Sequence, residues 1–287
     1  MAALFHKMVV AGVGLIGASL ALAAREHGLV EEIVGYGRSE KNLRYALDHG
    51  IIDAYFLSPD KFPSGVDFLV LGTPVAATAP LTKEFLPYMQ PGCVVSDVGS
   101  VKAEIVHNME NILPLSMPFV GAHPIAGGEQ WGAEPARADL FIGSRCILTP
   151  TKRTDPVALE KVSTLWKKVG AKVEELDIDT HDKILGLVSH LPHVLVYGLV
   201  NMMNRARVNS TEVIEYCGGG FKDFTRIASS RPELWRDICL LNREAVSGGL
   251  ADYIKELEKL KRFVDEGKGP ELEREFALAN EARRRLS

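Results

Sequence analysis

The residues best suited to chemistry lie in the segment GAHPIAGGE, residues 121–129, where His123 directly follows an apolar run. An imidazole titrates near neutral pH, so it can take a proton from a substrate hydroxyl while a neighbouring cofactor takes the hydride. The alternative interpretation is a loop histidine that is hydrogen-bonded to backbone. The elements around His123 must decide between the two.

Glycines near the N-terminus predict a cofactor site. Gly12, Gly14 and Gly17 form the pattern Gly-x-Gly-x-x-Gly between a predicted strand and a predicted helix. The first glycine permits a tight turn, the second lets a pyrophosphate approach the backbone, and the third allows close packing of the helix on the strand. The expected dinucleotide contacts are Gly12, Gly14, Leu15, Ile16, Gly17, Arg38, Ser39, Thr73 and Pro74.

The end of the second predicted strand bears on the choice between NAD and NADP. A carboxylate at this place would bind the ribose hydroxyls of NAD, but the sequence has Arg38 and Ser39, which suit a 2′-phosphate and favour NADP. Two alternatives stay open, because Arg38 can instead stack on the adenine and Glu40 can turn toward the ribose.

Short β-branched runs alternate with helical patterns, and the early runs contain few polar residues, which is typical of central parallel strands covered on both faces. The predicted strands are residues 8–11, 32–36, 68–72, 94–97, 119–122, 146–149 and 172–176. We therefore expect an α/β fold. A Rossmann-type, doubly wound and mostly parallel sheet in residues 1–178 would bind the dinucleotide, and residues 179–287 would form an all-α substrate and dimerisation domain.

The second domain is predicted to begin with a helix from His181 to about Arg205, capped by Asp179 or Thr180 and apolar on nearly all sides. Such a helix is expected to be buried, with a kink at Pro192. Because its apolar surface exceeds what the rest of the domain can easily cover, we expect a homodimer. Further helices are expected at about residues 211–216, 232–265 and 270–284.

Composition limits the partners. The chain has 287 residues, 46% of them hydrophobic, and a formal net charge of −4, so it offers no broad cationic surface for nucleic acid or an anionic membrane. Residues 8–24 resemble a signal peptide, but glycines at turn spacing interrupt them, and no other run approaches membrane-spanning length. Four separated cysteines indicate neither a disulfide framework nor a zinc site, and the cytoplasm is the simplest compartment.

Three further motifs carry polar groups. In DVGSVK, Ser100 could cap the next helix, orient His123, or do both. In SHLPH, residues 189–193, two histidines at i and i+3 have no accompanying carboxylate or thiolate, so anion binding or core hydrogen bonds are favoured and no metal is predicted. In GGGFKDFTR, residues 218–226, a helix N-terminus and Arg226 would form a carboxylate receptor, with a solvated surface turn as the alternative.

The glycine pattern, DVGSVK, GAHPIAG, SHLPH and GGGFKDFTR, in this order, resemble the prephenate and arogenate dehydrogenases of tyrosine biosynthesis. The resemblance runs from the first predicted strand to at least Trp235. It implies an NAD(P)-dependent oxidoreductase that oxidises the ring C4 hydroxyl of prephenate, releases carbon dioxide and forms 4-hydroxyphenylpyruvate, with arogenate as the alternative substrate. The family is more often linked to NAD, which opposes the local preference for NADP.

The same resemblance implies roles for single residues. His123 accepts the hydroxyl proton, and Ser100 orients His123 and the cofactor. Arg226 binds the ring carboxylate, and His193 approaches the side-chain end of the substrate. Other residues implied to surround the substrate are Glu129, His181, Lys222, Asp223 and Trp235. The sequence ends without the βαββαβ regulatory module of some relatives, so any feedback by tyrosine is expected at the active site or the dimer.

Two rival functions fit parts of the same pattern. A β-hydroxyacid or imine reductase also joins a dinucleotide domain to a helical dimer domain, but its expected catalytic lysine or glutamate on the long helix is missing. A dinucleotide-sensing dimer without catalysis would not need His123, Ser100 and Arg226 to converge.

Overall fold

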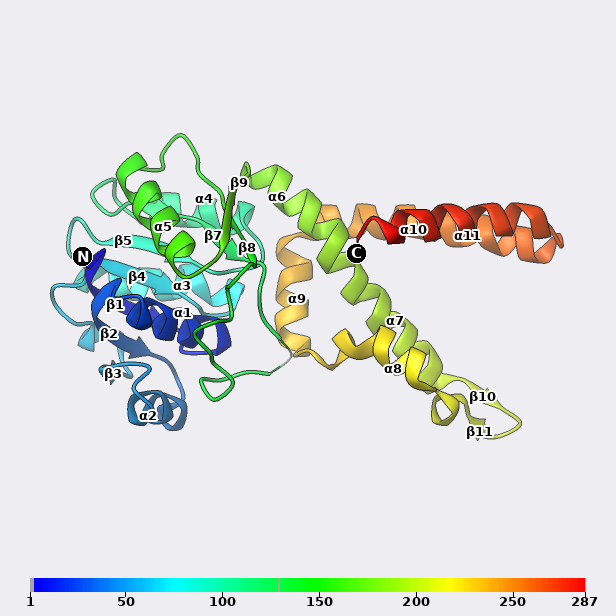
Figure 1. Cartoon of the computed structure of the whole chain (residues 1–287), viewed down its shortest axis with the longest axis horizontal. Helices are drawn as coiled ribbons and strands as arrows, with labels where there is room; N and C mark the ends of the chain where they lie inside the picture. Colours follow the sequence, from blue (N-terminus) through cyan, green and yellow to red (C-terminus); the bar gives the residue numbers. More distant parts are fainter. Residues whose placement is uncertain (1–2, 129, 287) are drawn as a thin grey trace. The chain divides into compact units, whose positions relative to one another are not determined.

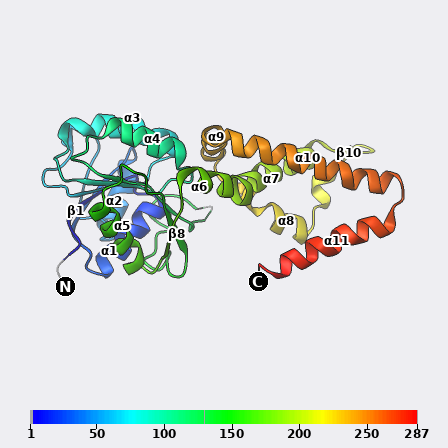
Figure 2. The same ribbon diagram turned by 90° about the horizontal axis from the view of Figure 1, so that it is seen from above.

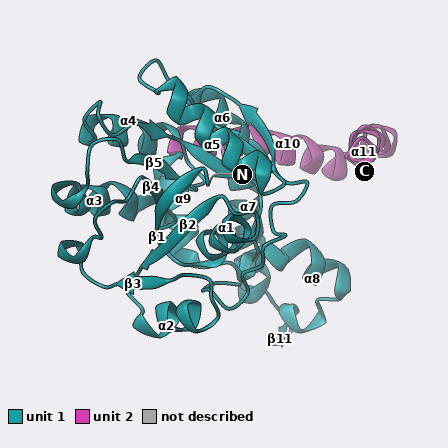
Figure 3. Ribbon diagram, turned by 60° about the vertical axis from the view of Figure 1, so that its left-hand side comes forward, with its two compact units in different colours: residues 1–242 teal, residues 243–287 magenta. Residues whose placement is uncertain are grey.

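The computed structural model describes residues 3–128 and 130–286, and the chain divides into two compact units, Met1–Asn242 and Arg243–Ser287 (Figure 3). The first unit contains every strand of the described residues and the helices up to α9, and the second contains α10 and α11 (Figure 1). The domain change expected at 178/179 stays a prediction. The first compact unit extends past this point, and His181, Asp182 and Ile238 are buried within it.

A parallel sheet forms the centre of the first unit. Over the described residues it has six strands in the order β3-β2-β1-β4-β5-β6. Its strands are β1 Phe5–Ala11, β2 Val30–Tyr36, β3 Ala54–Phe56, β4 Phe68–Leu71, β5 Val94–Asp97 and β6 Phe119–Val120. This is the Rossmann strand order, so the predicted doubly wound fold is confirmed. The edge strand β3 was not predicted, because three residues beginning with the exposed Ala54 do not make an apolar run.

Helices cover both faces of this sheet (Figure 2). They are α1 Leu15–Glu26, α2 Glu40–Asp48, α3 Val75–Phe85, α4 Ala103–Ile112 and α5 Pro156–Lys168, with short 3-10 helices at Pro59–Lys61 and Leu86–Tyr88. One hydrophobic core contains Leu20 of α1, Leu43 of α2 and Trp166 of α5. The other contains Phe85 of α3 and Met109 of α4. The strands are thus buried from both sides, which is why they read as apolar runs.

A second, three-stranded sheet follows, made of β7 Ala122–Pro124, β8 Arg145–Leu148 and β9 Lys172–Glu175. Strand β7 pairs antiparallel with β8, and β8 pairs parallel with β9. The strand predicted over 119–122 is therefore divided at Gly121, where a Cβ atom would lie 2.5 Å from Thr149 Oγ1. A Cβ atom at this passage between the sheets would require Thr149 to shift, and the division places His123 on the smaller sheet.

The predicted long helix is present as one helical run, Ile178–Arg205. It consists of α6 Ile178–Leu185, a π-helical turn Gly186–His190 and α7 Leu191–Arg205. Its cap is Asp177, whose carboxylate accepts the backbone N–H of Thr180 at 2.9 Å, and not Asp179 or Thr180 as expected. The irregular π turn directly precedes α7 and Pro192, whose ring nitrogen cannot donate a helical hydrogen bond.

Much of this helical run is exposed in the single chain. Val196 is the buried residue of α7, whereas the apolar side chains of Ile184, Leu187, Val188 and Met202 are exposed. The expectation of a buried helix is therefore wrong for one chain. With 28 residues and a mean hydropathy of 1.4 in its most apolar part, the run also could cross a membrane by length and composition alone. The prediction that no such second run exists is wrong, because hydropathy averages tolerate a few serines and histidines.

The remaining elements differ from the sequence-based predictions at two places. Strands β10 Arg207–Val208 and β11 Thr211–Glu212 and the 3-10 helix Val213–Tyr216 replace the helix expected at 211–216, because Asn209 and Ser210 adopt φ of 47° and 71° and form a hairpin turn. The helix expected at 232–265 is divided at Asn242, whose side chain donates a hydrogen bond to the carbonyl oxygen of Asp182. The other helices are α8 Gly219–Thr225, a 3-10 helix Arg226–Ser229, α9 Pro232–Leu241, α10 Arg243–Asp265 and α11 Gly269–Arg284.

Candidate active site

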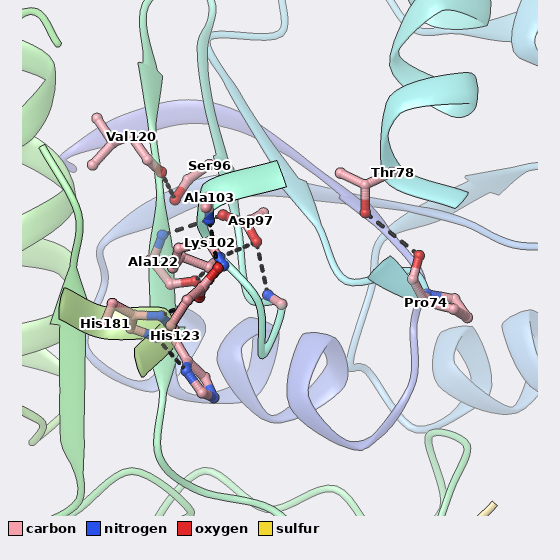
Figure 4. A network of polar contacts seen from close by, with 12 residues as sticks. Pro74, Thr78, Ser96, Asp97, Lys102, Ala103, Val120, Ala122, His123 and His181 are labelled. Carbon is pink, nitrogen blue, oxygen red and sulfur yellow. Dashed lines mark hydrogen bonds and ion pairs between the residues drawn. The ribbon is translucent and has the colours of Figure 1, made fainter. Parts of the chain in front are cut away.

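His123 lies on β7 with only 8% of its surface exposed, and its ring nitrogen Nδ1 is 2.8 Å from Nε2 of His181 on α6 (Figure 4). His181 is fully buried, and its own Nδ1 is 2.7 Å from Oδ1 of Asp182. The predicted proton acceptor is therefore hydrogen-bonded to another side chain and not to backbone. Two neighbouring residues of one helix support it.

The surroundings of His123 keep its imidazole neutral. Burial lowers the pKa of His123 well below 6.5, and the positive charges that His181, Lys102 and His190 can carry lower it further. A neutral ring retains a lone pair, which a general base requires. At neutral pH, His123 is thus in the protonation state that can accept a proton.

A buried ion pair fixes the backbone beside His123. The ammonium of Lys102 donates hydrogen bonds to the carboxylate of Asp97 and, at 2.8 Å, to the carbonyl oxygen of Ala122 (Figure 4). Asp97 in turn accepts the backbone N–H of Ala122 at 3.2 Å and of Gly99 at 2.8 Å. Asp97 and Lys102 are the first and last residues of the motif DVGSVK, and no role was predicted for them from the sequence. The signal that could have predicted the ion pair is a negative and a positive residue close together at the end of an apolar strand.

The start of α4 is capped by Asp182. Its carboxylate accepts the backbone N–H of Lys102 at 2.8 Å and of Ala103 at 2.9 Å. The expectation that Ser100 caps this helix is therefore wrong, because the helix begins only at Ala103 and the cap comes from a residue about 80 positions away. Within the described part of the chain, no hydrogen bond joins the half-buried Ser100 side chain to His123, so the orienting role of Ser100 stays a prediction.

The glycine turn leaves room for a phosphate group. Gly12 has φ of +99°, and a Cβ atom there would lie 2.5 Å from the carbonyl group of Gly72. At Gly14 a Cβ atom would meet nothing within 4 Å, and α1 begins there with no side-chain cap on its N–H groups. The side-chain oxygen of Thr73 is buried without a partner among the described residues. Open space, helix N–H donors and an unsatisfied hydroxyl fit a dinucleotide.

At the end of strand β2, the guanidinium of Arg38 is available to a ligand, whereas the nearby carboxylate of Glu40 is engaged in other contacts. Arg38 is exposed, and the hydroxyl of Ser39 accepts the N–H of Asn42 at 3.3 Å as the cap of α2. Glu40 accepts hydrogen bonds from Arg44 at 2.9 Å and Tyr55 at 3.1 Å. The alternative in which Glu40 turns toward a ribose would break both contacts.

Comparisons with known families agree with this geometry. The family described as "Prephenate dehydrogenase, nucleotide-binding domain" matches residues 20–175, and that described as "Prephenate dehydrogenase, dimerization domain" matches residues 177–278. The chain belongs to the prephenate dehydrogenase family. The resemblance drawn from the sequence motifs is thus confirmed, and with it the interpretation as an NAD(P)-dependent oxidoreductase.

Individual members of the prephenate dehydrogenase family match nearly the whole chain. The prephenate dehydrogenase of Bacillus subtilis (strain 168) is 34% identical over 96% of this chain and 75% of its own length. The cyclohexadienyl dehydrogenase of Zymomonas mobilis is 31% identical over 97% of this chain and 95% of its own length. The crystal structure of prephenate dehydrogenase from A. aeolicus, in complex with hydroxyphenyl propionate and NAD+, matches with a TM-score of 0.92, 37% identity and 98% of each chain covered.

The histidines of the family motif SHLPH face different partners. His193 stacks on Trp235, with ring centroids 3.4 Å apart, and its Nδ1 lies 2.9 Å from the carbonyl oxygen of Ser189. His190 is buried beside Asn242, with burial lowering its pKa to about 4. In the part of the chain that the structure describes, no group of three His, Cys, Asp or Glu side chains could hold a metal ion.

The charged residues of GGGFKDFTR are exposed. Lys222 and Asp223 lie on α8, and Lys222 lines a cavity of about 460 Å³. Helix α8 begins at Gly219 and Arg226 follows its opposite end, so the N-terminus of α8 is not beside Arg226, and the role of Arg226 as a carboxylate ligand stays a prediction. Glu129, also implied by the family resemblance, lies outside the described residues.

Proposed function

We propose that this chain is a prephenate dehydrogenase, which oxidises the ring C4 hydroxyl of prephenate, releases the ring carboxylate as carbon dioxide and forms 4-hydroxyphenylpyruvate. The observation that supports this most is a neutral, buried imidazole, His123, backed by His181 in a chain whose glycine turn suits a dinucleotide. Aromatisation of the ring drives the loss of the carboxylate, so the protein need supply only positioning and a proton acceptor.

The protein residues divide this work. The turn Gly12–Gly17, with Thr73 and Pro74, would hold the dinucleotide, whose nicotinamide accepts the hydride. His123 takes the proton of the C4 hydroxyl, and the Lys102–Asp97 pair keeps the backbone of that strand in place. From the family resemblance, Ser100 orients His123 and cofactor, Arg226 binds the ring carboxylate, and the side-chain end faces His193. Other residues proposed near the substrate are Glu129, Lys222, Asp223 and Trp235, with His181 behind His123.

For the cofactor, two arguments oppose each other. Arg38 and Ser39 favour a 2′-phosphate and hence NADP, because the carboxylate of Glu40 is engaged by Arg44 and Tyr55. The A. aeolicus enzyme, 37% identical, was solved with NAD+. We propose that the chain accepts both dinucleotides and prefers NADP.

Arogenate is the second candidate substrate. It differs from prephenate only in an amino group in place of the side-chain keto group, so the same His123 chemistry serves both. The similarity to a cyclohexadienyl dehydrogenase favours considering it. Selection between the two would depend on the groups near His193, since His193 is proposed to face that end.

We further propose that residues 1–178 bind the dinucleotide, that residues 179–287 bind substrate and dimerise, and that a second copy of the chain covers the exposed apolar side chains of α6 and α7. A membrane is a poorer cover, because the same helical run contains three buried polar residues in contact with other protein groups, namely His181 with His123, Asp182 with Lys102 and His190 with Asn242. The cytoplasm is the proposed compartment.

Initial rates of nicotinamide reduction test the proposal. Purified protein is offered prephenate and arogenate in turn, each with NAD and with NADP. We expect the highest kcat/KM with prephenate and NADP. Turnover of arogenate alone would replace the proposed substrate, and no turnover in all four mixtures would overturn the function.

A further inference from the structure

A buried chain of polar contacts ends on His123. Nδ1 of His123 lies 2.8 Å from Nε2 of His181, and Nδ1 of His181 lies 2.7 Å from Oδ1 of Asp182. His181 has no exposed surface, and both of its ring nitrogens have partners within the protein. The resemblance places His181 near the substrate, but these contacts leave it no nitrogen for a substrate atom.

The carboxylate at the far end of this chain is ionised. Burial by itself raises the pKa of Asp182, but hydrogen bonds from His181 and from the backbone N–H groups of Lys102 and Ala103 outweigh burial, and the pKa is lowered overall. An ionised carboxylate accepts hydrogen bonds and cannot donate them. Nδ1 of His181 must therefore carry a proton and donate it to Asp182.

The remaining protons follow in order. An imidazole whose single N–H is at Nδ1 has its lone pair at Nε2, so the neutral form of His181 accepts at Nε2. Its partner, Nδ1 of His123, must then be the donor. The single N–H of neutral His123 is thereby used toward His181, and the lone pair stands at Nε2 of His123, the nitrogen turned away from this chain.

We infer that Asp182 and His181 are positioning residues that fix the tautomer and the ring orientation of His123 and so make its Nε2 the proton acceptor of the reaction. The inference rests on the proposed function, in which His123 is the base, and it identifies the residues that orient that base. In the reverse tautomer, Nε2 of His123 would carry a hydrogen atom and could not take a proton from a hydroxyl.

The matched pair His181→Gln and His181→Leu tests the contact with His123. Both substitutions remove the imidazole and leave the bonds of Asp182 to α4 in place, but only glutamine offers an oxygen that can accept from Nδ1 of His123. We expect kcat to fall about 100-fold or more in His181→Leu, with at least about tenfold more activity retained in His181→Gln. The KM for substrate should stay within about threefold in both. Equal kcat values in the two variants, or a loss confined to KM, would overturn the inference.

Asp182 needs a separate test, because it also caps α4. Asp182→Asn puts an N–H₂ group beside donors, so it should lower kcat in the wild-type background and leave kcat unchanged in the His181→Leu background. A role limited to the cap would lower kcat equally in both backgrounds, and that result would refute the positioning role. If Asp182→Asn does not fold, the glutamine and leucine pair still decides.

A spectroscopic readout separates this inference from the proposed function. In the enzyme without substrate, nitrogen–proton correlation spectra of the histidine rings distinguish Nδ1–H from Nε2–H, and His123→Asn identifies the signals of His123. We expect His123 to carry its hydrogen on Nδ1. A hydrogen on Nε2 would overturn the inference even in an active enzyme, whereas inactivity in all four substrate and cofactor mixtures would overturn the function and leave the tautomer measurement valid.

Discussion

Two glycines of the dinucleotide turn give the sharpest contrast, because the same substitution should harm stability at one and binding at the other. At Gly12 the backbone has φ of +99°, and an added Cβ atom would lie 2.5 Å from the carbonyl group of Gly72. At Gly14 the backbone is extended, with φ of −95°, and an added Cβ atom would meet no protein atom within 4 Å. Gly12→Ala and Gly14→Ala therefore differ in what the new methyl group meets.

The magnitudes follow from these environments. An alanine in the conformation of Gly12 costs about 1–3 kcal/mol in backbone strain, and overpacking against Gly72 costs about 1–3 kcal/mol more. A loss of about 3 kcal/mol in the free energy of unfolding lowers Tm by roughly 6–12 °C for a unit of this size. Gly14→Ala should leave Tm unchanged or slightly raised, since alanine restricts the unfolded chain. Its methyl group would instead displace a pyrophosphate from the helix N–H groups. Losing one charge-assisted hydrogen bond of about 1.5–3 kcal/mol weakens Kd roughly 10- to 150-fold.

Thermal unfolding without ligand and calorimetric titration with NAD and NADP measure the two effects on the same preparations. The reasoning fails if Gly14→Ala binds both dinucleotides with the wild-type Kd, since the open space before α1 would then not hold the phosphates. It fails equally if Gly12→Ala melts at the wild-type temperature. If each single variant showed both a lower Tm and weaker dinucleotide binding, the two glycines would not have separable roles.

Three further predictions concern the reaction. His123→Asn should lower kcat about 10²- to 10⁴-fold in steady-state assays with little change in KM, and a change in KM alone would contradict its role as base. Because neutral His123 is active and burial holds its pKa below 6.5, kcat/KM should be constant near neutral pH and fall only below pH 6.5; a profile without this acid limb would disagree. Arg38→Asp should shift the kcat/KM preference from NADP toward NAD by about tenfold or more, and an unchanged ratio would mean that Arg38 does not contact a 2′-phosphate.

The sheet and its cofactor turn could be predicted because their determinants are local. Strand β5 was predicted with the bounds Val94–Asp97 that the structure has, since a strand buried on both faces is an apolar run. The glycine pattern likewise encodes its own turn. By contrast, the division of α9 from α10 depends on Asn242, whose side chain donates to the carbonyl oxygen of Asp182 at 2.7 Å. No periodicity in residues 232–265 reports a contact with residue 182.

The same distinction explains what was missed at the site. His123 was found because its residue type and surrounding motif suggest proton transfer. Asp182 was not, because it reads as an ordinary acidic residue at the start of the predicted apolar helix, and its partners Lys102 and Ala103 lie 80 and 79 residues away. The exposure of α7 in the single chain also could not be predicted from the sequence. An apolar helix is equally consistent with burial in its own chain and with burial by a second copy.

Helix α6 joins two functions that a sequence motif would treat separately. The carboxylate of Asp182 caps the N-terminus of α4. The same carboxylate is hydrogen-bonded to His181, whose ring is in turn hydrogen-bonded to His123. A shift of α6 along its axis would therefore uncap α4 and release the base together. Since DVGSVK leads into α4 and GAHPIAG carries His123, this single helix contacts both segments that the cofactor and the substrate are proposed to contact. Proton transfer and hydride transfer need their groups closely aligned, and the buried carboxylate of Asp182 adds its support to the direct hydrogen bonds that Lys102 and Asp97 make with Ala122.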